Sequence, residues 1–138
     1  GGAENAHCWS DGWKERVTLM HLLTHSAGFK EWYNFKAMGL DDASKIREWV
    51  LTEAEMVYVP GTAYRYSDLS MIVLGFVVEK VAGESLAAFA GANIFAPLGM
   101  GSTAFRGGAG SDFDWDTRIV PTEVDRVERA RLLWGEVH

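Results

Sequence analysis

The chain has 138 residues, of which 48% are hydrophobic and 23% charged, as in an ordinary globular domain. This composition excludes a disordered or collagen-like chain. Nineteen acidic against 13 basic residues give a net charge of −6, which argues against a nucleic-acid partner because nucleic-acid-binding proteins need a basic face. The single cysteine, Cys8, cannot form an internal disulfide, so the sequence does not indicate a redox compartment or a localisation.

The sequence predicts no targeting or membrane-spanning segment. Its first residues are polar and aromatic, whereas a signal peptide has a basic stretch followed by an apolar run. The densest apolar run, Met71 to Val78, is far shorter than the ~20 residues that cross a bilayer. The chain opens with Gly1-Gly2 and carries no initiator Met, and we interpret this opening as a cloning remnant or the start of an excised piece. The expected organisation is one partial domain over residues 1–138, with a polar stretch (1–14), a helical subdomain (15–106) and a loop-rich segment (107–138).

The spacing of apolar residues predicts two helices in the first part of the chain. The first lies within residues 17–25, with Thr18 as a possible N-cap. It ends before Gly28, a residue suited to a left-handed backbone. The second covers about 41–52, where either of the first two aspartates can cap it and three apolar residues form one stripe.

The third predicted helix, residues 68–82, is the most informative. Its many β-branched residues would also suit a buried strand. Its length, Asp68 as a cap and the following Gly83 favour a helix instead. Only three polar residues lie inside it, so we expect it to be buried on most sides and to form the centre of the fold.

The remainder of the chain is predicted to be less regular. A fourth, amphipathic helix is expected from Ser85 to about Phe95, before Pro97. Residues 107–115 are rich in Gly and Asp and are interpreted as a loop. A short helix is expected near residues 123–133. The predicted fold class is therefore mainly α with long loops.

Two histidines, His21 and His25, stand four residues apart, which is the spacing of zinc ligands in H-E-x-x-H helices. Position 22 is leucine, so the general base of that motif is missing, and no third ligand stands at an obvious spacing. The favoured interpretation is that both imidazoles hydrogen-bond the backbone at a helix end. The sequence thus indicates neither a metal nor another cofactor.

A candidate site for acid–base chemistry precedes the third helix. The chain breaks at Pro60-Gly61-Thr62 and continues through Tyr66-Ser67-Asp68 into the N-terminus of that helix, whose free N–H groups favour negative charge. Tyrosine ordinarily has a pKa of about 10, so a tyrosine acts as a base near neutral pH only beside a cation. Taken alone, the string is a weak signal. The alternative is that Asp68 caps the helix and Tyr66 packs in the core.

The wider context resembles a known family. Residues 17–29, VTLMHLLTHSAGF, are similar to the "ITxxHLLTHTSGL" segment of serine hydrolases related to class C β-lactamases and DD-peptidases. Residues 60–68, PGTAYRYSD, are similar to the "PGTxFxYSN/D" segment of the same family. Further matches follow in the same order at residues 74–83, 94–100, 119–123 and 134–138. The resemblance covers roughly Glu15 to His138.

The resemblance implies acyl transfer through a serine. In the family an S-x-x-K motif supplies the nucleophile and a lysine, and the tyrosine of a Y-x-N motif helps to move the proton. By this resemblance Tyr66 is the general base or proton shuttle, acting on a small-molecule acyl substrate. Asp68 stands where many members have Asn. A carboxylate there fits a helix cap or a partner of the lysine better than the side-chain amide contact that Asn makes in the family. Ser67 is a minor option as a proton-relay serine, as in the S-D-N motif, although Leu69 breaks that pattern.

The chain lacks the other motifs of the family. No serine is followed by a lysine three positions later, and neither a K-T-G nor an H-x-G motif is present. We therefore expect the helical subdomain of an α/β serine hydrolase without most of its sheet, inactive alone on esters, amides or β-lactams. The alternative is a non-catalytic helical binding or assembly module, in which exposed apolar faces drive self-association. The sequence does not indicate the substrate class.

Overall fold

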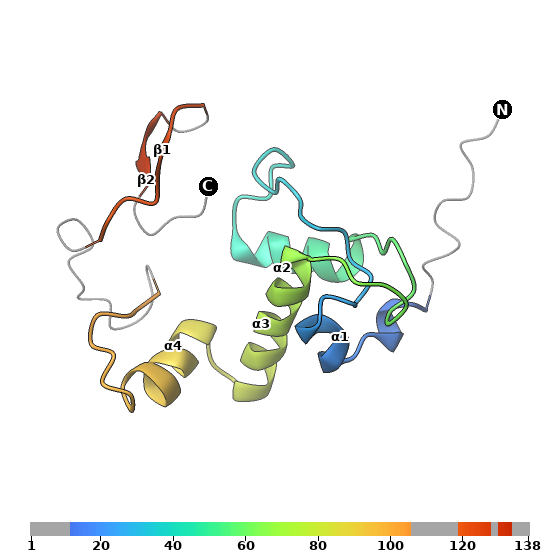
Figure 1. Cartoon of the computed structure of the whole chain (residues 1–138), viewed down its shortest axis with the longest axis horizontal. Coiled ribbons are helices and arrows are strands. Elements are labelled where there is room, and N and C mark those ends of the chain that lie inside the picture. The colour runs from blue at the N-terminus through green and yellow to red at the C-terminus, as the bar shows by residue number, and fades with distance from the viewer. Residues whose placement is uncertain (1–11, 106–118, 128–129, 134–138) are drawn as a thin grey trace. The chain divides into compact units, whose positions relative to one another are not determined.

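The computed structural model describes residues 12–105, 119–127 and 130–133, and the chain forms two compact units, 1–81 and 82–138. Among the described residues the chain is mainly helical with a single two-stranded sheet, which confirms the predicted fold class (Figure 1). None of the described helices is long and apolar enough to cross a membrane. The helical elements are η1 (Lys14–Arg16), α1 (Leu19–Leu23), α2 (Ala43–Thr52), α3 (Asp68–Ala82), α4 (Leu86–Ala90) and η2 (Gly91–Phe95), and the strands are β1 (Glu123–Asp125) and β2 (Arg131–Leu133).

Helix α1 begins with a reciprocal cap. The hydroxyl of Thr18 accepts a hydrogen bond from the amide of His21 at 3.2 Å, and the amide of Thr18 donates to His21 Nδ1 at 3.3 Å. The predicted N-cap is therefore confirmed, and the histidine takes the place that Glu or Gln has in the usual capping box. After the helix, Gly28 adopts a φ of 99°, the left-handed backbone expected from the sequence.

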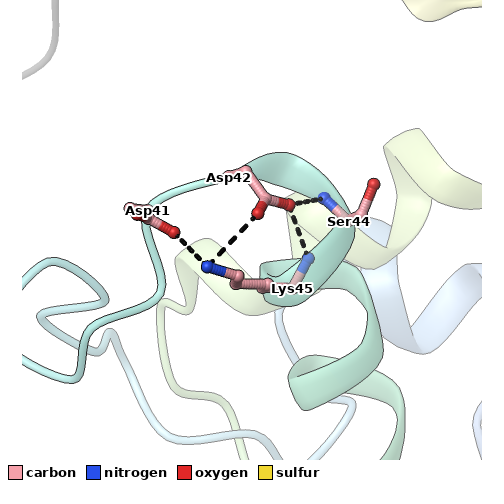
Figure 2. A network of polar contacts seen from close by, with 4 residues as sticks. All are labelled: Asp41, Asp42, Ser44 and Lys45. Atoms are coloured by element: carbon pink, nitrogen blue, oxygen red, sulfur yellow. Dashed lines mark hydrogen bonds and ion pairs between the residues drawn. The ribbon is translucent and has the colours of Figure 1, made fainter.

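Helix α2 is capped by the second of its two candidate aspartates (Figure 2). One carboxylate oxygen of Asp42 accepts from the amides of Ser44 and Lys45 at 2.8 and 2.9 Å. The Lys45 ammonium lies 2.6 Å from the Asp41 carboxylate, so both aspartates hold the same first turn. The buried residue of the predicted apolar stripe is Val50, which is 1% exposed.

Helix α3 is less buried than the sequence suggested. Only Leu69 and Ser70 in its first turn are fully buried, and Val81 is 83% exposed. The prediction of burial on most sides is wrong because the apolar residues of α3 surround the whole helix, while the described core contacts one face. Val73 and Leu74 lie on that face. The buried core of this unit consists of Leu22, Ala27, Phe29, Ala54, Met56 and Leu69.

The cap of α3 also differs from the prediction. Asp68 is the first residue of the helix, and the serine before it, Ser67, accepts a long hydrogen bond from the amide of Ser70 at 3.4 Å. The cap is thus displaced by one residue, because a serine hydroxyl reaches the third helical amide as well as a carboxylate does. Further along, the Arg47 guanidinium pairs with Glu79 and lies 4.4 Å from the ring centre of Phe76, which ties α2 to α3.

The second unit begins with α4, which Ser85 caps by accepting from the Ala88 amide at 3.2 Å. The helix continues into η2, a π-helical turn closed by the Ala96 amide bonding the Gly91 carbonyl at 3.0 Å. Together the two elements cover the helix predicted before Pro97. Residues 107–115, predicted to be a loop, lie outside the described residues. The two-stranded sheet belongs to the same unit as α4 and η2.

The prediction of a short helix near residues 123–133 is wrong. This segment forms the antiparallel pair β1 and β2, in which Val124 faces Leu132. Between the strands, the Asp125 carboxylate accepts from the Val127 amide at 3.0 Å, a side-chain turn that competes with helix formation. Ala130 has a φ of 50°, which also interrupts a helix.

Candidate functional site

The candidate site lies where two segments distant in sequence run side by side. An antiparallel bridge joins Phe29 to Met56, and the amide of Val57 donates to the Gly28 carbonyl at 2.7 Å. The further backbone bonds run from Gly61 N to Ser26 O (2.9 Å), from Arg65 N to His25 O (2.9 Å) and from Asp68 N to Glu31 O (2.8 Å). We call these four backbone bonds the backbone ladder. It fixes residues 57–68 against residues 25–31, although α2 separates them in the chain.

Tyr66 is presented to the surface by this arrangement. Its side chain is 60% exposed, so the alternative in which it packs in the core is wrong. The centre of its ring lies 4.6 Å from that of His25, with the two planes tilted by 36°. Tyr64, two residues earlier and 73% exposed, meets the same imidazole edge-on at 6.3 Å. The rings of both tyrosines therefore contact the imidazole of His25, and the ring of Tyr66 lies closer to it.

Ser67 lies in the opposite environment. It is 1% exposed, and its hydroxyl donates to the Lys30 carbonyl at 2.7 Å. The amide of Ser67 donates to Nδ1 of His25 at 3.2 Å. This hydroxyl also accepts from the Ser70 amide at the start of α3, so it bonds backbone groups both as a donor and as an acceptor.

Asp68 occupies the first turn of α3, where its exposed carboxylate is favourably placed near the positive end of the helix dipole. Its backbone amide donates to the carbonyl of Glu31. The carboxylate of Glu31 in turn lies 3.0 Å from the guanidinium of Arg65, an ion pair with both side chains nearly half exposed. Glu31 thus holds the residues before and after the Tyr66–Ser67 pair.

The two histidines bond the backbone as the favoured interpretation proposed. Nδ1 of His21 accepts from Thr18, and Nδ1 of His25 accepts from Ser67. Within the part of the chain that the structure describes, no three His, Cys, Asp or Glu side chains gather as metal ligands would.

The sequence did not reveal the contact between His25 and the Tyr66–Ser67 pair. From the sequence, this histidine was expected to hydrogen-bond the backbone at a helix end, with no indication of which segment it would contact. The bond from the Ser67 amide to His25 joins residues 42 positions apart, and hydrophobic periodicity carries no information at that distance. The one available signal was that both segments belong to motifs of the same family.

Comparison with known proteins identifies the family. Residues 6–137 match the family described as Beta-lactamase. "Esterase EstB" of Burkholderia gladioli is 35% identical in an alignment 109 positions long, which covers 70% of this chain and 28% of that protein. A protein of Escherichia coli K12 named "Putative D-alanyl-D-alanine carboxypeptidase" is 29% identical in an alignment 140 positions long, which covers 91% of this chain and 32% of the relative.

The chain thus spans about a third or less of the length of these relatives. The family match nevertheless extends over almost the whole sequence, and it includes both segments that form the backbone ladder. The chain therefore belongs to the beta-lactamase family of serine hydrolases.

Proposed function

We propose that this chain contributes the tyrosine element of a serine hydrolase active site whose nucleophile lies outside it. The observation that carries the proposal is the contrast between two neighbours, since Tyr66 is 60% exposed while Ser67 is 1% exposed. The ladder and the ion pair of Glu31 with Arg65 hold the phenol on a fixed backbone, as a proton-transfer group requires.

In the complete site, Tyr66 accepts the proton of a serine nucleophile and returns it to the leaving group. The lysine of an S-x-x-K motif would stabilise the phenolate that this role needs. No serine of this chain has a lysine three positions later, so we propose that the chain alone is inactive. The names of the relatives, an esterase and a carboxypeptidase, support an ester or amide as the acyl substrate.

The neighbours of Tyr66 take supporting roles in this proposal. Ser67 stabilises the start of α3, because its buried hydroxyl is bonded to Lys30 and Ser70. A proton-relay role for Ser67 stays the minor option. Asp68 is exposed at the first turn, where its carboxylate can pair with the lysine of the complete site.

The first test is intact-mass analysis of the 138-residue chain after incubation with a fluorophosphonate and, separately, with a penicillin. We expect no adduct with either reagent. A stoichiometric adduct on a serine would overturn the proposal, because it would place a competent nucleophile within this chain.

The second test uses the polypeptide encoded by the whole open reading frame that contains this sequence. We expect it to react with the fluorophosphonate, and Tyr66→Phe to slow that reaction by about 100-fold or more, the usual contribution of a general base. Tyr64→Phe is the matched control, because Tyr64 is an exposed phenol beside the same imidazole. Equal rates for the two variants, or a reading frame without an upstream S-x-x-K, would contradict the proposal.

A second candidate function is a non-catalytic module that self-associates. The observation in its favour is that α1 exposes three large apolar side chains, with Leu19, Met20 and Leu23 each more than 50% exposed. If this function is correct, the isolated chain forms dimers in sedimentation velocity, and Met20→Glu returns it to a monomer. A wild-type chain that sediments as a monomer at high concentration would exclude this function.

A further inference from the structure

His25 contacts the Tyr66 segment through three separate groups. Its imidazole ring stacks against the phenol at 4.6 Å, and its Nδ1 accepts the amide hydrogen of Ser67 at 3.2 Å. Its carbonyl oxygen accepts from the amide of Arg65 at 2.9 Å and from the hydroxyl of Tyr58 at 3.2 Å. The residues immediately before and after Tyr66 are therefore both bonded to the residue that the phenol stacks on.

The backbone of His25 is itself held in an uncommon conformation. Its φ is 53°, in the left-handed region, which is uncommon for residues other than glycine and in which Asn, Asp and His are enriched. This conformation lets the carbonyl and the side chain of one residue face the same neighbouring segment. The hydrogen bond from the Ser67 amide uses Nδ1 of His25 as its acceptor, so the imidazole acts on this segment through that nitrogen.

We propose that His25 is the positioning residue of the Tyr66 phenol. Its Nδ1 and carbonyl fix the backbone on either side of Tyr66, and its ring restricts the phenol to one orientation. This inference rests on the proposed function, because positioning matters for catalysis only if Tyr66 transfers a proton. A purely structural role would hold the backbone but would leave the orientation of the phenol unaffected by the imidazole ring.

The variants separate the ring from the hydrogen bond. In His25→Asn, the amide oxygen can replace Nδ1 as acceptor and asparagine tolerates the left-handed backbone, so that chiefly the ring is lost. In His25→Gly, both the ring and the acceptor are lost. The matched control is His21→Asn, since His21 also uses Nδ1 to accept a backbone amide, that of Thr18, and has no described ring contact with Tyr66.

The first measurement is NMR of the 138-residue chain with carbon-13-labelled tyrosine, the Tyr66 ring signals being assigned with Tyr66→Phe. We expect His25→Asn to shift these signals, because the ring current of the imidazole is removed, while the Ser67 amide stays protected from exchange. His25→Gly should shift the signals and also lose that protection. His21→Asn should do neither. Unchanged Tyr66 signals in His25→Asn would overturn the inference, and this variant decides it even if His25→Gly fails to fold.

The second measurement is fluorophosphonate labelling and ester hydrolysis by the polypeptide of the whole reading frame. We expect His25→Gly to lower kcat by about 100-fold with little change in KM, as a displaced catalytic group does, and His25→Asn to have an intermediate kcat because it keeps the acceptor but loses the ring. A wild-type kcat in His25→Asn would overturn the inference. Failure of the proposed function is distinguishable, because Tyr66→Phe would then react at the wild-type rate whatever the NMR spectra show.

Discussion

The ammonium of Lys14 donates a hydrogen bond to the carbonyl oxygen of Thr52 at 2.9 Å, and so closes the C-terminal end of α2 from a distant part of the chain. A second bond reaches the Leu51 carbonyl at 3.3 Å. The last carbonyls of a helix lack partners within the helix and carry partial negative charge, so a cation is favourable there.

This contact leads to a first prediction. Lys14→Met should lower the free energy of unfolding by about 1 kcal/mol, because two helix carbonyls lose a charged donor. Lys80→Met, at an exposed position in the last turn of α3, should change it by less than half as much. Urea denaturation measures both, and equal losses would show that the Lys14 bonds do not stabilise α2.

The contribution of Lys14 to stability depends on pH, and the direction follows from its pKa. Burial lowers the pKa of Lys14 below its ordinary value of 10.5, with Glu53 and Glu15 opposing the shift. Between the lowered pKa and 10.5 the unfolded chain binds the proton more tightly than the folded chain, so stability rises with pH in that window. We therefore expect the wild type to gain stability relative to Lys14→Met as the pH approaches 10.5.

A second prediction concerns Gly28, whose carbonyl accepts one of the four bonds of the ladder. A Cβ at this position would approach the Tyr58 carbonyl oxygen to 2.4 Å, and its φ of 99° strains any other residue. Gly28→Ala should lower the free energy of unfolding by about 3 kcal/mol, from strain and overpacking together. Gly83→Ala should cost only about 1 kcal/mol. Its φ of 73° is strained for alanine, but a Cβ there would meet no described atom beyond its chain neighbours within 4 Å. Thermal denaturation of the two variants tests this ranking, which similar losses would contradict.

A third prediction compares two buried serines of the α3 N-terminus. Ser67 and Ser70 are each 1% exposed, but the Ser70 hydroxyl has no hydrogen-bond partner among the described residues. Ser70→Ala should therefore stabilise the chain by about 1 kcal/mol, since an unsatisfied hydroxyl is removed and a better helix former introduced. Ser67→Ala should destabilise it by about 2 kcal/mol, because the Lys30 carbonyl and the Ser70 amide lose their partner. Changes of the same sign in denaturation experiments would refute this assignment.

A fourth prediction uses the cap of α2. The backbone hydrogen bond from Lys45 is the main cause that lowers the pKa of Asp42 below its ordinary value of 3.8. A carboxyl whose pKa is lowered by folding stabilises the folded state above 3.8, and this contribution is lost as the pH falls through the lowered value. Asp42→Asn keeps a good N-cap but does not titrate. In acid titrations followed by circular dichroism, the wild type should thus lose stability relative to Asp42→Asn below pH 3.8. A constant difference would contradict this origin of the shift.

The sequence predicted those features that depend on near neighbours. Thr18 and Ser85 were identified as helix starts because their side chains bond amides three residues away. The start of α3 was displaced by one residue because Ser67 and Asp68 are both competent caps, and the choice depends on the bond between Ser67 and the distant Lys30.

The incorrect predictions involved pairing or packing between distant residues. Val124 faces Leu132 across a strand pair, and its own segment is too short to show alternation. For the site, the sequence singled out Tyr66, but taken alone its string left a buried position in the core as the alternative, which the 60% exposure of the side chain excludes. The His25 imidazole, which lies against the phenol, comes from the other motif, so a local reading of the Tyr66 segment could not find it.

The backbone ladder has a consequence for how this region can vary between related proteins. Its bonds join the chain just before and just after the excursion that carries α2, so the two ends of that excursion are held together at its base. Closing a longer loop costs little additional entropy, roughly 0.6 kcal/mol for each doubling of its length. Insertions and deletions around α2 can therefore accumulate during evolution while Tyr66 keeps its place against His25.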